Sequence, residues 1–213
     1  MAEKPQISIE FEKSLYGNAK IVCGVDEAGR GPLAGRVYAA AVILPENFSE
    51  ISELEKLNDS KKLSEKKRDE LAEVIKENAR AWCIAYADVE EIEELNILNA
   101  ALLAMNRAID GLSEKPEFAL IDGNCTKNIK INCKSVVGGD AKCPSIAAAS
   151  ILAKTERDRY CYDYLDKEFP EYGFGKHKGY GTKAHYDAVK KYGLCKEHRP
   201  SFFKKFFEAQ NNK

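Results

Sequence analysis

Several features that define other classes of protein are absent from this chain of 213 residues. No apolar run approaches the roughly 18 residues that a membrane-spanning helix needs. The opening stretch, MAEKPQISIEFEK, lacks the apolar core of a signal peptide, so a cytoplasmic location is expected. No internal repeat or low-complexity tract occurs. With 44% hydrophobic residues, the composition indicates one globular domain with an ordinary core.

Paired metal-binding cysteines are also missing. The chain has seven cysteines, an odd number, and no two of them form a C-x-x-C pair. This pattern argues against both a disulfide framework and a zinc site, and predicts reduced, mostly buried thiols. The three histidines all lie late in the chain without an evident triad. A side-chain nucleophile is therefore not expected.

Excess charge is lacking as well, because the net charge is −1. By itself this value argues against binding to nucleic acid, but the charges are distributed unevenly. Residues 171–213 contain ten Lys or Arg and four Asp or Glu, a local charge of +6, and the remaining residues carry −7. A basic C-terminal part on an acidic body can form a phosphate-binding face. A solvated, lysine-rich surface is the alternative that charge alone leaves open.

The hydrophobic pattern predicts early strands that pair locally and later strands that alternate with helices. Residues 29–35 form a glycine-rich turn, and the strands on either side of it could pair as a hairpin. This order of elements is typical of an α/β domain with a mixed sheet. Strands are expected at about 21–25, 37–44, 82–87, 118–121 and 135–137, and helices at about 64–79, 89–112, 144–165 and 182–193.

Four acidic residues follow predicted strands: Asp26, Glu27, Asp122 and Asp140. An acid directly after a buried strand must be paired, protonated or bound to a metal. Carboxylates that converge at one edge of a sheet repel one another, and hard oxygen ligands favour Mg²⁺ or Mn²⁺ over zinc. Two such ions can support the hydrolysis of a phosphodiester. The simpler alternative is that each acid caps a loop or a helix.

Asp26 and Glu27 are adjacent, which limits how both could reach one site. In a regular strand their side chains would point to opposite faces of the sheet. Either the strand has ended at these residues or one side chain alone is a direct ligand. The sequence leaves both alternatives open.

The turn at Asp26–Gly35 has the sequence DEAGRGPLAG. A dinucleotide-binding loop also carries glycines after a strand, but it leads into a helix, and two carboxylates here would repel a pyrophosphate. The glycines instead allow the backbone to approach a sugar–phosphate closely.

At this point the sequence resembles the bacterial ribonuclease HII family. The motifs that carry the resemblance fall in the family's order between about residues 20 and 203. They are DEAGRGPLAG at 26–35, LNDSKKLS at 57–64, LIDGN at 120–124, GGD at 138–140, SIAAASILAKTERD at 145–158, HKGYGTKAH at 177–185 and HRPSF at 198–202.

The resemblance implies a ribonuclease H fold, with a five-stranded mixed sheet flanked by helices and a helical C-terminal part. It implies a single catalytic domain over residues 1–213, with a core at about 20–168 and a basic helical part at about 169–213. It implies an endonuclease that hydrolyses the RNA strand of RNA–DNA hybrids and cuts on the 5′ side of ribonucleotides embedded in duplex DNA. It implies that the four acids hold two Mn²⁺ or Mg²⁺ ions, with Asp26 bridging them. The products of this cleavage would carry 3′-hydroxyl and 5′-phosphate ends.

The resemblance also implies residues that bind the substrate. Gly29, Arg30 and Gly31 match the turn that reads the 2′-hydroxyl through main-chain groups, and Tyr180 matches a tyrosine that stacks on the sugar of the next deoxynucleotide. A 2′-hydroxyl is the feature that distinguishes RNA from DNA at one nucleotide. Further candidates for phosphate contacts are Lys61, Lys154 and His185. An internal ion pair is expected for Arg157 and Asp158.

Three rival functions follow from the same residues. Ribonuclease HIII has a similar catalytic domain but usually an extra N-terminal domain, and this chain has about 20 residues before its first strand. Another nuclease of this fold would require a free end, and a binding module would hold hybrids without cutting. A monomer with no membrane contact is expected, and a contact with a replication clamp is left open. The aromatic segment 201–207 is expected to pack on the domain.

Overall fold

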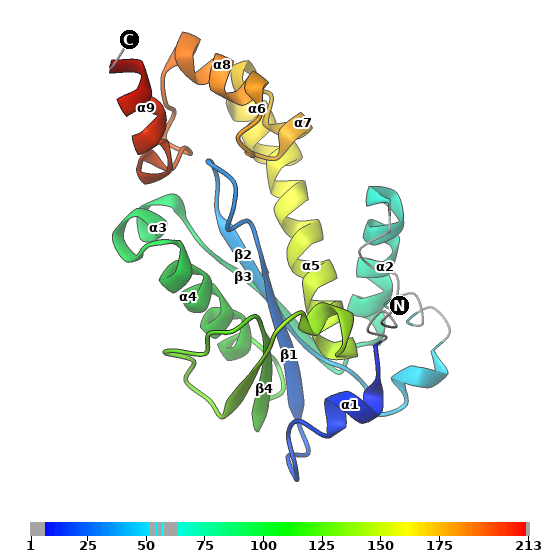
Figure 1. Ribbon diagram of the computed structural model, residues 1–213. Coiled ribbons are helices and arrows are strands. Elements are labelled where there is room, and N and C mark those ends of the chain that lie inside the picture. The colour runs from blue at the N-terminus through cyan, green and yellow to red at the C-terminus, as the bar shows by residue number, and fades with distance from the viewer. Residues whose placement is uncertain (1–6, 52–53, 55–56, 58–63, 212–213) are drawn as a thin grey trace, which may run out of the picture.

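The structure is a computed structural model that describes residues 7–51, 54, 57 and 64–211. Five strands form one mixed sheet in the order β3-β2-β1-β4-β5 (Figure 1). β2 runs antiparallel to both β1 and β3, whereas β4 and β5 run parallel to β1. The strands are β1 (Val22–Ala28), β2 (Val37–Ile43), β3 (Ala81–Ala87), β4 (Phe118–Asp122) and β5 (Cys133–Val136). The mixed five-stranded sheet and the β1–β2 hairpin are confirmed.

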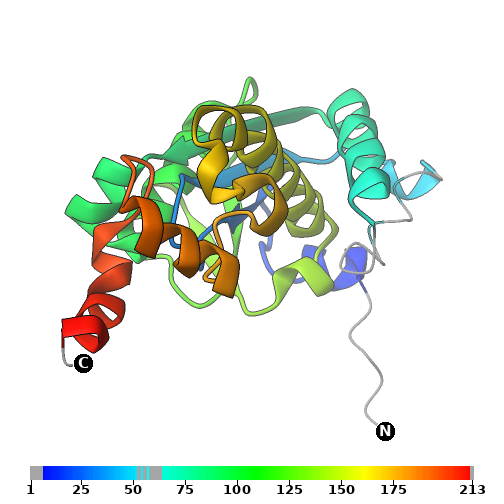
Figure 2. The ribbon, with the colours of Figure 1, turned by 90° about the horizontal axis from the view of Figure 1, so that it is seen from above.

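Helices cover both faces of this sheet (Figures 1 and 2). α5, the longest, crosses one face together with α2, and α4 lies on the other face. The helices are α1 (Ile9–Lys13), α2 (Glu65–Asn78), α3 (Val89–Leu95), α4 (Ile97–Asp110), α5 (Pro144–Tyr160), α6 (Asp166–Glu168), α7 (Phe174–His177), α8 (Lys183–Tyr192) and α9 (Lys204–Asn211).

β2 is buried along its whole length because the layers on both sides cover it. Side chains alternate between the faces of a strand. Ala39 and Ala41 therefore join the core with α4, while Ala40 and Val42 join the core with α2 and α5. A strand covered on both faces reads as a continuous apolar run, which is how this strand is recognised in the sequence.

The central strand β1 and helix α5 approach each other unusually closely at Gly24. A Cβ at this position would lie 2.2 Å from the main-chain carbon of Ser145. Only glycine fits, and the small residues Ala147, Ala148 and Ala149 continue the same packing along α5. This contact fixes α5 over β1, the strand that carries Asp26 and Glu27.

The helix expected over 89–112 is interrupted, so this expectation was wrong in one respect. α3 and α4 are separated by Asn96, whose φ is +66°. Asparagine tolerates this left-handed region better than most residues. Its side-chain oxygen accepts hydrogen bonds from the N–H groups of Leu98 and Asn99, so it caps α4 directly after ending α3.

The C-terminal part is packed onto the body through an apolar cluster. Leu33 and Tyr38 of the hairpin contribute to it, and so do Phe174, Val189 and Phe203 from the C-terminal part. Phe203 is fully buried, so the aromatic segment 201–207 packs on the domain as expected.

Two further expectations concern cysteines and membranes. All seven cysteines are free thiols, and Cys23, Cys143 and Cys161 are buried. None of the helices in the described part of the chain combines the length and apolar character that crossing a bilayer would require.

Candidate active site at the carboxyl ends of the parallel strands

The parallel strands bring the predicted acids to one edge of the sheet. β1 pairs with β4 so that Val25 lies opposite Ile121, and Asp26 and Asp122 are the next residues along their strands. Asp122 in turn lies opposite Val136 of β5, four residues before Asp140. Ligand sites in open α/β sheets lie at this edge.

The strand β1 continues through both Asp26 and Glu27 to Ala28. The alternative in which the strand ends before them is therefore wrong. Alternation along the strand puts Asp26 on the face toward α5, where Ser150 contacts its carboxylate. Glu27 starts from the opposite face, and its carboxylate accepts a hydrogen bond from Arg30 at 2.9 Å.

Burial and mutual repulsion raise the pKa values of these acids. Asp26 is almost fully buried, and its pKa lies well above the ordinary value because of desolvation, then because of the charges on Glu27 and Asp122. Burial also raises the pKa of Glu27, and the ion pair with Arg30 partly offsets that effect. The negative charges of these carboxylates therefore destabilise one another, and a cation bound between them would relieve that repulsion.

Asp122 and Asp140 are joined by the turn that follows β5. The main-chain N–H of Gly139 donates to Asp122 at 2.6 Å, and Asp140 is the next residue, in a 3₁₀ turn over Gly139–Ala141. Burial raises the pKa of Asp122, as does the charge of Asp140, while the main-chain N–H groups lower it. The turn thus places Asp140 beside Asp122.

The donor set fits a hard divalent cation, because it consists of carboxylates whose charges oppose one another. Within the described residues, no three Asp, Glu, His or Cys side chains are already gathered into a metal cage. Glu27 accounts for part of this, since its carboxylate is turned to Arg30. The four acids are neighbours that a cation could draw together.

The glycine-rich turn directly follows Asp26 and Glu27 in the chain. Gly29 has φ +101°, and a Cβ there would lie 2.9 Å from the carbonyl oxygen of Arg36. Neither the conformation nor the space admits a larger residue. Arg30 and Gly31 are exposed, and their N–H groups have no acceptor among the described residues. The turn therefore offers main-chain donors beside the acids.

Tyr180 lies next to this turn although it is about 150 residues away in the sequence. One of its ring carbons is 3.5 Å from the place a Cβ on Gly31 would take, and the side chain is about half exposed. The N–H of Leu33 donates to the carbonyl oxygen of Gly179 at 2.8 Å, which holds the two loops together. The structure thus brings Gly29, Arg30, Gly31 and Tyr180 into one surface.

His185 does not contact solvent, so the phosphate contact expected for it is not supported. Its side chain is fully buried, and burial lowers its pKa to about 4. Its Nδ1 lies 2.9 Å from the carbonyl oxygen of Tyr180, and its Nε2 lies 3.0 Å from Nε2 of His198. His185 therefore supports the loop that carries Tyr180.

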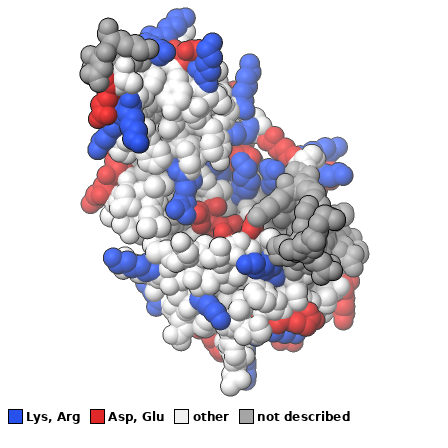
Figure 3. Space-filling model, in the orientation of Figure 1, with Lys and Arg blue, Asp and Glu red and all other residues white. Residues whose placement is uncertain are grey.

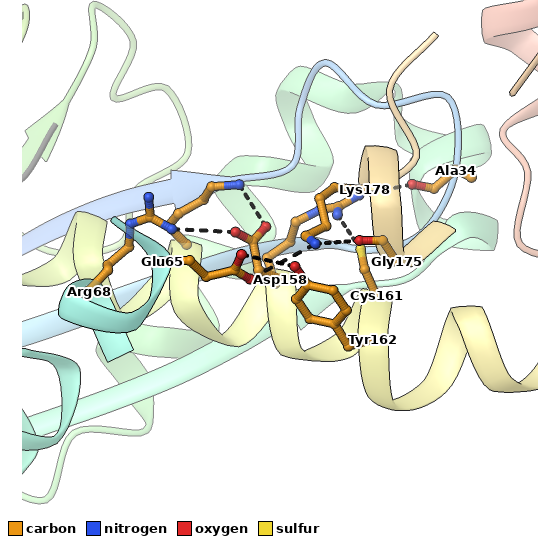
Figure 4. A network of polar contacts seen from close by, with 10 residues as sticks. Ala34, Glu65, Arg68, Asp158, Cys161, Tyr162, Gly175 and Lys178 are labelled. Atoms are coloured by element: carbon orange, nitrogen blue, oxygen red, sulfur yellow. Dashed lines mark hydrogen bonds and ion pairs between the residues drawn. The ribbon is translucent and has the colours of Figure 1, made fainter. Parts of the chain in front are cut away.

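Lys154 is engaged in an ion pair on α5. Its ammonium lies 2.6 Å from Asp158. Asp158 also pairs with Arg68 of α2 at 3.5 Å (Figure 4). The ion pair expected on this helix is therefore present, with Lys154 rather than Arg157 as the partner of Asp158. Arg157 instead donates to the carbonyl oxygen of Ala34. Lys61 lies outside the described residues.

Figure 3 shows the surface around this site in the orientation of Figure 1. The face is hollowed near its centre, acidic side chains lie in the hollow, and basic side chains flank it. Such an arrangement suits an anionic substrate that reaches the acids with a cation present.

Arg199 also belongs to this site, and its role could not be predicted from the sequence. Its guanidinium is fully buried and donates to the carbonyl oxygens of the glycine-rich turn. The motif HRPSF marked the segment, but nothing local predicts contacts with residues some 170 positions earlier.

Carboxylates at the carboxyl ends of a mixed five-stranded sheet, beside a turn with open main-chain donors, define a metal-dependent nuclease. The comparisons with known proteins agree. The chain belongs to the ribonuclease HII family, whose model, described as Ribonuclease HII, matches residues 23–209. It is a ribonuclease H, a metal-dependent endoribonuclease of type HII.

Relatives of known name support the same family. Ribonuclease HII of Neisseria meningitidis serogroup C is 58% identical over 183 residues, which cover 85% of this chain and 92% of that protein. Ribonuclease HII of Vibrio campbellii is 52% identical over 206 residues, which cover 95% of each chain.

Solved structures share the fold. Ribonuclease H2 from Pyrococcus horikoshii has a TM-score of 0.71 at 25% identity and covers 85% of this chain and 93% of its own. Ribonuclease HII from Archaeoglobus fulgidus, solved in complex with PCNA, has a TM-score of 0.71 at 27% identity and covers 84% and 94%. A Bst-RNase HIII solved with Mn²⁺ has a TM-score of 0.57 at 18% identity, and 70% of that chain is covered.

Proposed function

We propose that this ribonuclease recognises an RNA-to-DNA junction and cuts on the 5′ side of a ribonucleotide in duplex DNA. The RNA strand of a longer RNA–DNA hybrid is a second substrate. The products carry 3′-hydroxyl and 5′-phosphate ends. The observation that carries the proposal is that the Tyr180 ring lies beside the glycine-rich turn: one ring carbon is 3.5 Å from the place that a Cβ on Gly31 would take.

The turn selects the ribose through its main chain. The N–H groups of Arg30 and Gly31 have no acceptor among the described residues, and a 2′-hydroxyl can supply one. A deoxynucleotide would leave such donors without a partner and without water, which costs binding free energy.

Tyr180 selects the nucleotide that follows. Its ring stacks on a deoxyribose, where an added hydroxyl would crowd it. Because Tyr180 and Gly31 are neighbours, the two preferences act on adjacent nucleotides. Together they favour a ribonucleotide followed by a deoxynucleotide.

Asp26, Glu27, Asp122 and Asp140 are the residues that would hold two Mg²⁺ or Mn²⁺ ions. Bound there, these ions supply the positive charge that stabilises the attacking and leaving oxygens of phosphodiester hydrolysis. The fold buries Asp26 away from solvent, and the N–H of Gly139 holds the carboxylate of Asp122 by a hydrogen bond. The carboxylate of Glu27 is paired with Arg30, so a cation held by Glu27 would take the place of Arg30 as its partner.

The test uses a labelled DNA duplex with one internal ribonucleotide, an all-DNA control and a long RNA–DNA hybrid, each with Mg²⁺ or Mn²⁺. We expect one cut, 5′ of the ribonucleotide, that EDTA abolishes. Cleavage of the long hybrid alone would remove the junction roles of Tyr180 and the turn. No cleavage of any substrate would point to a module that binds hybrids.

A further inference from the structure

Arg199 places a buried positive charge beneath the glycine-rich turn. The side chain is fully buried and forms no ion pair among the described residues, although the charge of Glu93 lies near enough to favour the charged guanidinium. Burying a charge without an ionic partner is costly, and a well-packed neutral side chain would be cheaper for the fold. A role beyond packing would account for its presence here.

All hydrogen bonds of the guanidinium go to carbonyl oxygens of the turn, and its central carbon lies 5.2 Å from the centre of the Phe202 ring. Its Nη2 donates to Gly29 at 2.7 Å, its Nη1 to Arg30 at 3.1 Å and Pro32 at 2.8 Å, and both Nε and Nη2 donate to Gly35 at 2.9 and 2.7 Å. Its own N–H donates to the carbonyl oxygen of Leu33 at 2.9 Å. One side chain therefore fixes the direction of four peptide units.

Two of these peptide units carry the N–H groups of Arg30 and Gly31, which have no acceptor among the described residues. The carbonyl of Gly29 belongs to the same peptide plane as the N–H of Arg30, and the carbonyl of Arg30 to the same plane as the N–H of Gly31. In a trans peptide the C=O and the N–H point in opposite directions. Because Arg199 draws both carbonyls inward, the N–H groups of Arg30 and Gly31 point away from it, toward the exposed side beside Tyr180.

The same bonds also strengthen these donors. A cation at a carbonyl oxygen polarises its peptide, so the N–H at the other end becomes a better hydrogen-bond donor. We propose that Arg199 is the positioning residue for sugar selection, which aims and polarises the Arg30 and Gly31 N–H groups toward the 2′-hydroxyl. This inference rests on the proposed function of the turn.

Lysine cannot replace the guanidinium of Arg199. Its ammonium has three donors on a flexible stem, while the planar guanidinium has five in a fixed arrangement. Arg199→Lys keeps the charge and loses the geometry, and Arg199→Gln loses both. Arg159→Lys is the matched control, since Arg159 is partly exposed and pairs with Glu73 on the surface.

The experiment measures sugar preference directly. Fluorescence anisotropy gives the Kd for a DNA duplex with one ribonucleotide and for the same all-DNA duplex, with Ca²⁺ in place of Mg²⁺ and strand integrity checked on a gel. Circular dichroism establishes that each variant is folded. We expect the preference of the full chain for the ribonucleotide to fall about tenfold or more in Arg199→Lys, with all-DNA affinity within about twofold and Arg159→Lys unchanged.

Each outcome decides the matter. Equal loss of affinity for both duplexes, or full preference retained in folded Arg199→Lys, would overturn the role of Arg199. Failure of both variants to fold would assign the residue to stability and overturn it as well. Absence of any ribonucleotide preference in the unsubstituted protein would instead overturn the proposed function of the turn.

Discussion

At the scale of single residues, the negative charge of Asp26 destabilises the folded protein. Its pKa is raised, first by burial and then by Glu27 and Asp122. For a carboxyl with a raised pKa, the stabilising contribution is fully present below the unfolded value and is lost as the pH rises through the folded value. In the absence of metal, the unfolding free energy therefore falls toward neutral pH on account of this group.

The substitution Asp26→Asn should separate stability from activity. In EDTA at pH 7.5 the variant should melt about 2–4 °C higher than the unsubstituted protein, a change equal to about 1 kcal/mol for a chain of this size. Cleavage of a single-ribonucleotide duplex should fall on the order of a hundredfold or more, because a cation ligand is gone. Calorimetry and initial rates give the two values.

The control for this variant is Asp163→Asn, because Asp163 is exposed near the end of α5 and pairs only with Lys167 among the described residues. Both melting temperature and rate should stay close to their original values. The stability gain of Asp26→Asn should also shrink as the pH is lowered, because protonation removes the same charge from the unsubstituted protein. A gain that grows toward acidic pH would contradict the argument.

Residues of this site differ in how well the sequence predicts them. The four acids could be found because they come at or soon after the ends of apolar runs that predict strands, and parallel strands end at one edge. Tyr180 and the glycine-rich turn came from the family resemblance. The buried position of His185 could not be read from its neighbours, because Phe174, His198 and Phe203 come from other segments to cover it.

At the scale of elements, the C-terminal part is held by a directed chain of hydrogen bonds. The N–H of Cys195 donates to Nδ1 of His198, so the Nε2 of His198 carries the proton and donates to Nε2 of His185. The Nδ1 of His185 then donates to the carbonyl oxygen of Tyr180. Both imidazoles are neutral in this arrangement, and a second proton on either would break it.

This chain of bonds makes the protein sensitive to acid. Burial lowers the pKa values of His185 and His198 to about 4. A histidine with a lowered pKa contributes stability that is present above its unfolded value near 6.5 and lost as the pH falls toward its folded value. Urea titrations between pH 7.5 and 4.5 should show the pair losing on the order of 5 kcal/mol.

The variant His198→Asn isolates this effect, since an asparagine oxygen can still accept from Cys195 but does not titrate. Its unfolding free energy should decline less steeply with falling pH than that of the unsubstituted protein. The carboxylates titrate in both proteins, so they cancel from the difference. Identical slopes would show that the histidines do not carry the pH dependence.

Element boundaries show where the sequence pattern stops being informative. The apolar spacing over 89–112 fits one continuous helix and does not reveal the break at Asn96, because each of the two helices keeps a buried apolar face, with Ile92 in α3 and Leu102 and Met105 in α4. The predicted end of β1 came one residue before Asp26 because the apolar run ends there. The strand continues because main-chain pairing with β2 reaches Ala28, and pairing does not depend on apolar side chains.

At the scale of the whole molecule, the basic C-terminal part is not an independent unit. The cluster that joins Leu33 and Tyr38 to Phe174, Val189 and Phe203 crosses its boundary with the body. Arg199 crosses it again through the turn. Elements that share a core unfold together, so the protein should melt in one cooperative transition.

The single Trp82, on β3, reports on the body, and hydrogen exchange of the α8 amides reports on the C-terminal part. In urea the two probes should give one midpoint. Phe203→Ala should lower the unfolding free energy by about 3–5 kcal/mol and move both midpoints together, because it empties the shared cluster. Phe207→Ala, at a side chain that is 38% exposed, should cost clearly less. Loss of α8 protection at lower urea, with Trp82 unchanged, would show that the C-terminal part unfolds on its own.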